Sequence, residues 1–211
     1  MSVHVHPKPY ADESCNFFYN LLFCDDPTLF APKEAESLNS WKQLLVAETP
    51  DATALRTLAE NESMESRIRV LAYNCLRRHG EEVPKRKLLG VIVEVSLERG
   101  LDTLAAYQDG RIRYINQAEK LAIFEASPVP VAAKVNELMV AAQLVVNQIG
   151  PWDGARLEPP KGTDVRMTFL ASDGLYLGQG PFEVMAHDSM GGPVMKRASE
   201  LLQLVVAVAV E

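Results

Sequence analysis

The chain of 211 residues lacks the short motifs by which many enzymes are identified. It contains no phosphate-binding loop, no H-E-x-x-H zinc motif, no EF-hand loop and no G-x-S-x-G nucleophile elbow. Its acidic residues are dispersed, so no two carboxylates can be assigned the roles of general acid and general base. We therefore expect neither catalytic residues nor a cofactor, and the sequence favours a protein that is not an enzyme.

Cysteine is scarce, and the pattern for a metal centre is incomplete. Cys15, Cys24 and Cys75 form no C-x-x-C and cannot all pair with one another, which suits a reducing compartment. His4 and His6 have a spacing that can chelate zinc, but the second cluster of ligands is missing. A frayed N-terminus explains the two histidines more simply, so the sequence predicts no metal site.

Long hydrophobic runs and a signal peptide are also missing. The most apolar segment, 201–210, is ten residues long, about half of what a membrane-spanning helix needs. The first residues lack a basic region followed by an apolar stretch. The sequence therefore predicts a cytoplasmic protein with no membrane contact.

An excess of positive charge, which nucleic-acid binding normally requires, is absent. The formal net charge is −7, from 21 Lys and Arg against 28 Asp and Glu. The densest basic stretch, 77–87, is interrupted by Glu81 and Glu82 and contains no aromatic residue. It is typical of a helix end that runs into a solvated linker, so we expect no nucleic-acid partner.

The first eighty residues carry helical patterns. The composition, 47% hydrophobic and 23% charged, is that of a folded globular chain. Ser14 and Ser63 stand in N-cap positions, and Gly80 ends the last pattern. These signals predict a helical segment over residues 1–84 that packs on a sheet formed by the rest of the chain, with helices in four stretches: 15–24, 34–48, 52–60 and 63–79.

A charged stretch with one proline, 81–87, marks a boundary, after which apolar residues alternate. Val91, Val93 and Val95 share one side of the first predicted strand. The dipeptide Asp109-Gly110 favours a two-residue hairpin turn, because both residues readily adopt positive φ. We expect a four-stranded meander over residues 88–126.

An apolar helix, three more strands and a second apolar helix complete the predicted order. The first helix follows Pro130 and the second begins near Pro193. The strands between them are expected at 165–172, 175–180 and 182–188, with Asp173-Gly174 as a second hairpin turn.

The two hairpins and two helices indicate an internal repeat. The Asp-Gly turns are 64 positions apart (173 minus 109), and the two prolines are 63 apart (193 minus 130). The sequence thus predicts an α+β domain over residues 85–211, built from two tandem strand-turn-strand-strand-helix units at 101–150 and 165–211. Both apolar helices would lie on one face of a shared antiparallel sheet. Coincidence is the alternative, because such hairpins and helices are common.

Two functions remain open. The first is a noncatalytic cytoplasmic interaction or assembly module that forms a homo-oligomer or binds a protein partner. This hypothesis is favoured because the sequence contains no catalytic motif, while its two helices are unusually apolar.

The alternative is a small-molecule enzyme or ligand sensor with a pocket between the N-terminal helices and the sheet. Glycine N–H groups at the start of a helix can receive an anion, and basic residues follow one turn later. The candidate ligand-binding residues for a small anionic group are His187, Ser189, Gly191, Gly192, Lys196 and Arg197.

Overall fold

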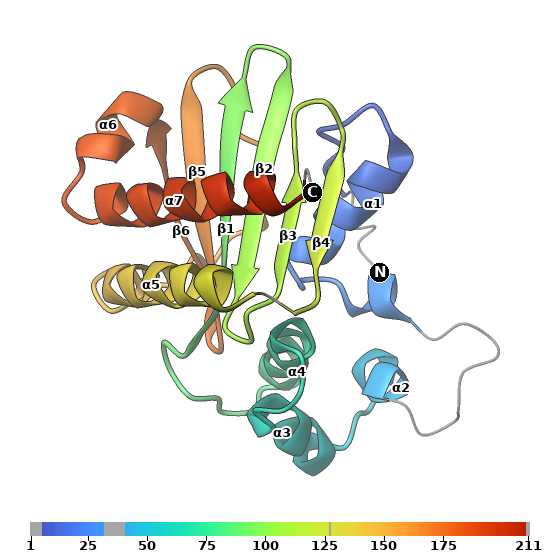
Figure 1. The fold of residues 1–211 in the computed structure, drawn as a ribbon. Coiled ribbons are helices and arrows are strands. Elements are labelled where there is room, and N and C mark those ends of the chain that lie inside the picture. Colours follow the sequence, from blue (N-terminus) through green and yellow to red (C-terminus); the bar gives the residue numbers. More distant parts are fainter. Residues whose placement is uncertain (1–5, 32–40, 127, 210–211) are drawn as a thin grey trace.

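One antiparallel sheet of six strands forms the centre of the computed structural model, which describes residues 6–31, 41–126 and 128–209 (Figure 1). The strands are β1 (Leu88–Leu97), β2 (Gly100–Tyr107), β3 (Ile112–Ile115), β4 (Leu121–Phe124), β5 (Asp164–Ala171) and β6 (Gly174–Pro181). They lie in the order β4-β3-β2-β1-β5-β6. β1 to β4 are the predicted meander, and β5 pairs with the other side of β1.

Helices cover both faces of the sheet (Figure 1). The N-terminal helices pack on one face, and the two apolar helices α5 and α7 lie together on the other. The α+β class, the N-terminal helical segment and the shared face of the apolar helices are therefore confirmed. The helices are α1 (Glu13–Leu22), the 3-10 helix η1 (Pro27–Phe30), α2 (Trp41–Val46), α3 (Ala52–Glu60), α4 (Ser66–Arg78), α5 (Val129–Val146), α6 (Phe182–His187) and α7 (Gly191–Ala209).

The N-cap of α1 differs from the one predicted. Asp12, rather than Ser14, caps the helix, because its Oδ1 accepts a hydrogen bond from the backbone N–H of Cys15 at 2.8 Å. Aspartate and serine are about equally favoured at the N-cap, so capping preference alone does not predict which of the two caps this helix.

The start of α4 also differs from the prediction. The helix begins at Ser66, three residues later than expected, while the hydroxyl of Ser63 donates to Asn61 in the preceding turn. The cap comes from a distant residue: Oδ2 of Asp109 accepts the backbone N–H of Ser66 at 2.6 Å. The helix stops at Arg78, and Gly80 takes positive φ, as predicted.

The helix predicted over residues 34–48 is shorter in the described part of the chain. α2 spans Trp41–Val46 and is followed by irregular backbone. Residues 34–40 lie outside the described residues.

A buried ion pair links the sheet to the N-terminal helices. The carboxylate of Glu94 on β1 accepts Nε and Nη2 of Arg166 on β5 at 2.7 and 2.9 Å. The hydroxyl of Tyr19 on α1 donates to the same carboxylate at 2.6 Å. The side chains of Glu94 and Arg166 are 0% and 1% exposed. These bonds satisfy two charges that would otherwise be very costly to bury.

α5 and α7 lie side by side and antiparallel on the opposite face. Lys134 and Glu137 of α5 form a four-membered ion cluster with Arg197 and Glu200 of α7, with N···O distances from 2.9 to 3.0 Å. The side of α5 that faces the sheet and α7 is buried and apolar, with Val131, Val135, Leu138, Met139, Ala142 and Val145 at helical spacing.

By length and composition, α5 is apolar enough to cross a membrane, with a mean hydropathy of 1.4, and it is the one helix of the described chain that meets this criterion. In the structure it packs along α7 and against β1 and β2. Because 39% of its residues are buried, a large part of its surface remains open.

The strand predicted at residues 182–188 is wrong. This segment forms α6, which begins directly after Pro181 at the end of edge strand β6. Phe182, Met185 and Ala186 have helical spacing, and the side chain of Met185 packs against Gly178 and Gly180 of β6. The second unit therefore has a helix where the first has its third strand.

The two Asp-Gly hairpins flank β1 in mirror order. β2 and β5 both pair antiparallel with β1, so they run in the same direction, but β3 and β6 lie on opposite sides of them. A rotation that exchanged the hairpins would turn the sheet over and carry α5 to the face opposite α7. Because both helices lie on one face, the units do not superimpose with the Asp-Gly turns aligned.

A different axis fits the strand order. A twofold axis perpendicular to the sheet, between β1 and β2, exchanges β1 with β2 and exchanges β3, β4 and α5 with β5, β6 and α7. Each rotated strand then falls on a strand that runs in the same direction. It also exchanges the two halves of the ion cluster, since Lys134 corresponds to Arg197 and Glu137 to Glu200. The internal repeat stays a prediction, and the helices are its best-matched part.

Candidate functional site

The loop before α7 uses its own carboxylate to satisfy its backbone. Oδ1 of Asp188 accepts the N–H groups of Gly191 and Met190 at 2.6 and 2.9 Å, and the carbonyl of Asp188 accepts the N–H of Gly192. The hydrogen bonds from Gly191 and Met190 lower the pKa of Asp188. An external anion would have to displace this carboxylate from the helix start.

The six predicted ligand-binding residues do not converge. His187 turns back to the carbonyl of Glu183 at 2.7 Å, Ser189 and Lys196 are exposed, and Arg197 belongs to the ion cluster. The sequence predicts a pocket between the N-terminal helices and the sheet, with this loop holding an anionic group, but the loop lies on the α7 side of the sheet, away from those helices (Figure 1). Anion binding at the loop itself stays a prediction.

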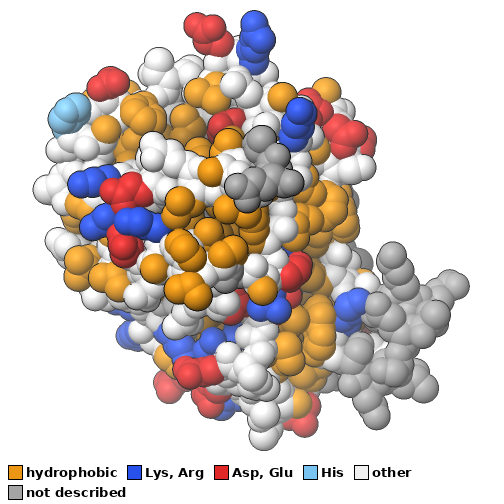
Figure 2. Space-filling model, viewed as in Figure 1, with side chains coloured by type: hydrophobic (Ala, Val, Ile, Leu, Met, Phe, Trp, Pro, Cys, Tyr) orange, Lys and Arg blue, Asp and Glu red, His pale blue; other side chains and the backbone are white. Residues whose placement is uncertain are grey.

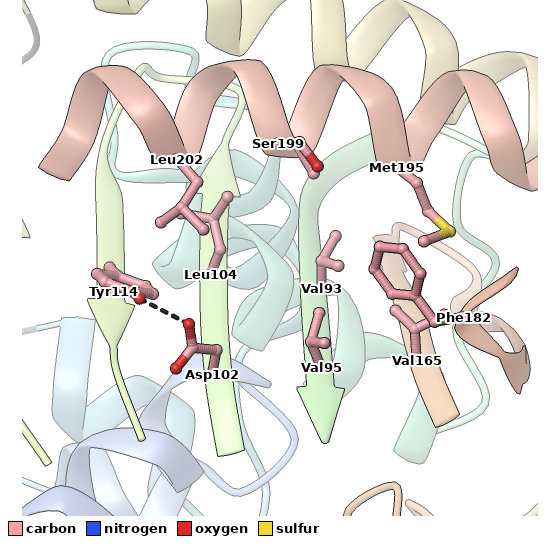
Figure 3. Close-up of a pocket in the computed structure, with 11 residues that line it drawn as sticks. Val93, Val95, Asp102, Leu104, Tyr114, Val165, Phe182, Met195, Ser199 and Leu202 are labelled. Atoms are coloured by element: carbon pink, nitrogen blue, oxygen red, sulfur yellow. Dashed lines mark hydrogen bonds between the residues drawn. The ribbon is translucent and has the colours of Figure 1, made fainter. Parts of the chain in front are cut away.

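A hollow opens where the sheet extends past α7. The strands continue beyond the helix, and no described helix covers their ends (Figure 1). The side chains of the strands and of α7 enclose a cavity of about 50 Å³ that opens to the surface (Figure 3). We call it the α7 hollow; its apolar walls include Val95, Leu104, Val165, Phe182, Met195 and Leu202.

The alternation of the strands and two small side chains create this hollow. Val93 and Val95 point to the same side of β1, so the apolar surface continues beyond α7. On the helix, Ala198 and Ser199 also line the hollow, and they are too short to fill the space above the sheet. Larger residues at these two positions would close it.

The polar end of the hollow is already satisfied. The Tyr114 hydroxyl donates to Oδ2 of Asp102 at 2.8 Å, and Oδ1 of Asp102 accepts the backbone N–H of Gln117 at 2.7 Å (Figure 3). Burial, followed by the bond to Asp102, raises the pKa of Tyr114, so the phenol keeps its proton. The lining holds no nucleophile paired with a base, and what it offers a ligand is apolar surface.

The surface above α7 is apolar as well. Phe182 at the start of α6 is 39% exposed, and Leu97 at the end of β1 is also exposed. Figure 2 shows hydrophobic side chains gathered over this part of the molecule and over α5 and α7. A partner that enters the hollow would therefore meet further apolar surface at its rim.

Metal ligands do not come together in the described residues. No group of three His, Cys, Asp or Glu side chains among them could hold an ion. His6 instead contacts Asp26 at 3.0 Å, and Cys15 and Cys24 are buried. His4 lies outside the described residues.

Sequence reasoning missed the α7 hollow. The signals were the small pair Ala198 and Ser199 within an apolar helix, and Val95 near the end of its strand. These signals become informative only when the position of α7 across the strands is known.

Comparisons with known proteins yield no relative. No family model, no curated protein and no solved structure matches this chain.

Proposed function

We propose that this protein is a noncatalytic interaction module whose α7 hollow receives an apolar side chain of a protein partner. The observation that carries the proposal is the apolar hollow itself, open at the surface beside exposed Phe182. Tyr114 and Asp102, which line its polar end, are bonded to each other, and this favours an occupant without charge there.

The size of the hollow favours a protein segment over a small molecule. Pockets for drug-sized ligands typically enclose about 300–1,000 Å³, whereas this cavity has about 50 Å³. It can take part of one leucine, isoleucine or aromatic side chain, and contacts at the rim would complete the burial of that side chain, which contributes roughly 1.5–3 kcal/mol. The rest of the affinity must come from the rim, which a longer segment can reach.

The alternative of a small-molecule enzyme or sensor gains no comparable support. The backbone donors of the loop before α7 are bonded to Asp188, and Arg197 is held in the ion cluster between α5 and α7.

The three cysteines are buried and free of disulfides, which supports the expected reducing, cytoplasmic environment.

Peptide selection tests the proposal. Random linear peptides are displayed and selected on the wild-type protein, and their affinities are then measured by fluorescence anisotropy. Ser199→Trp places a large side chain at the hollow, whereas Gln203→Trp adds the same side chain to an exposed position of α7 outside its lining.

We expect selected peptides to share a single large apolar anchor. Ser199→Trp should weaken their binding about tenfold or more, the value of one lost buried side chain, and Gln203→Trp should leave it nearly unchanged. Circular dichroism confirms that both variants fold. Failure to select any peptide, or equal loss in both variants, would overturn the proposal.

A further inference from the structure

The outer side of α5 presents an apolar stripe that no described element covers. Val140 and Leu144 are 57% and 60% exposed, and Val129 at the start of the helix is more exposed still. Ala132 and Asn136 are exposed between them. We call Val129, Ala132, Asn136, Val140 and Leu144 the α5 stripe.

The α5 stripe carries no net charge. The charged residues of α5 are Lys134 and Glu137, and both are held in the ion cluster with α7. The whole chain carries −7, so two copies repel each other over most surfaces. An uncharged stripe is the surface on which a second copy can approach without this cost.

A second hollow lies directly beside the α5 stripe. It has a volume of about 390 Å³ and runs between α5 and the Asp109-Gly110 turn. Three residues of the stripe, Ala132, Asn136 and Val140, line its helix side together with Val135, Met139 and Gln143. The carboxylate of Asp109 is bonded to Arg111 and to the N–H of Ser66, so its charge is compensated. The space beside Ala132 can receive a side chain the size of valine.

We infer that the occupant of this surface is a second copy of the chain, with the two α5 helices packed antiparallel about Asn136. In this arrangement Val140 of each protomer lies opposite Ala132 of its partner, because both are four residues from Asn136. The contact is self-complementary, as a twofold dimer requires. Facing asparagines at the centre fix the register, the role that a buried asparagine has in coiled coils.

We expect the proposed dimer to be weak. An 18-residue helix is about 27 Å long, and a single helix-to-helix contact lies below the area of a standard stable interface. We therefore expect association that depends on concentration in the micromolar range or above. The inference does not depend on the α7 hollow, because the two hollows share no lining residue, and α5 and the strand ends beyond α7 lie on opposite sides of α7 (Figure 1).

Sedimentation equilibrium over a wide concentration range tests the dimer. The wild-type protein should shift from monomer to dimer as its concentration rises. Val140→Lys should abolish the shift, because it would place a charged ammonium group against Ala132 of the partner helix. Val184→Lys on α6 is the matched control, since Val184 is 62% exposed on the other side of α7, and it should dimerise as the wild type does.

Disulfide trapping gives an independent measurement. Asn136→Cys places a thiol at the proposed axis, while the three native cysteines are buried. Under mild oxidation this variant should form a covalent dimer far faster than Val184→Cys. A wild-type protein that stays monomeric at every concentration, a dimer that survives Val140→Lys, or equal trapping of both cysteine variants would overturn the inference.

Discussion

The two faces of the sheet are held by different interactions. Toward the N-terminal helices, charged side chains are buried: Glu94 and Arg166 pair with each other, and Tyr19 donates to the pair. Toward α5 and α7, the buried side chains of the central strands are apolar, such as Val91 and Val93. Directional bonds fix one arrangement of the N-terminal helices, whereas apolar packing is less exacting. Both proposed binding surfaces lie on the apolar side.

The largest effect should follow from breaking the buried pair. Glu94→Ala leaves the Arg166 guanidinium buried without its carboxylate, and we expect a loss of about 3–5 kcal/mol in the free energy of unfolding. Urea denaturation measures it. Combining Glu94→Leu with Arg166→Met removes both charges and should recover most of the loss. A loss below about 1 kcal/mol in Glu94→Ala would contradict the contrast between the faces.

A large but smaller effect is expected on the apolar face. Leu201 of α7 is fully buried against the sheet. Leu201→Ala should lower the free energy of unfolding by roughly 3 kcal/mol, the usual cost of a leucine-sized cavity. Leu202→Ala on the same helix is the control, because Leu202 is only partly buried. Equal losses in the two variants would show that Leu201 does not face the sheet as described.

Removing one hydroxyl tests the directional bond itself. Tyr19→Phe keeps the ring and deletes the hydrogen bond to Glu94, which should cost about 2 kcal/mol because the acceptor is charged. The same urea titration applies. In the Glu94→Leu and Arg166→Met background, Tyr19→Phe should cost much less, and an unchanged cost there would rule out the bond as its origin.

The smallest effect concerns pH and the ion cluster between α5 and α7. Hydrogen bonds from Lys134, and then from Arg197, lower the pKa of Glu200 below its ordinary value. This carboxylate therefore contributes stability above the ordinary glutamate range, and the contribution is lost as the pH falls through the depressed pKa. Melting temperatures of the wild type should fall slightly more steeply in acid than those of Glu200→Gln. Parallel curves would show that the cluster contributes nothing.

Local patterns predicted the elements that depend on local sequence. The buried side of α5, the meander and the stop at Gly80 all follow from periodicity and turn residues within a short window. The segment after Pro181 was assigned to a strand because alternation and helical spacing are hard to separate over six residues. Pro181 is the last residue of the edge strand β6 and the N-cap position of the short helix that begins at Phe182.

Tertiary roles could not be predicted from the same windows. The carboxylate of Asp109 caps α4, 43 positions earlier in the chain, and Asp173 accepts the backbone N–H of Arg86 at 3.0 Å. Both aspartates suggested only a hairpin turn. Similarly, the mirror order of the hairpins depends on which side of β1 each strand joins, and local patterning does not determine that choice.

The α7 hollow is tested most directly by methyl NMR of the protein bound to a selected peptide. The methyl groups of Val95, Leu104, Val165 and Leu202 should shift most, because they form its walls. The methyl signals of Ile92 and Leu170, which face the N-terminal helices, should not shift. Shifts that cluster on that opposite face, or that spare the walls of the hollow, would contradict the account.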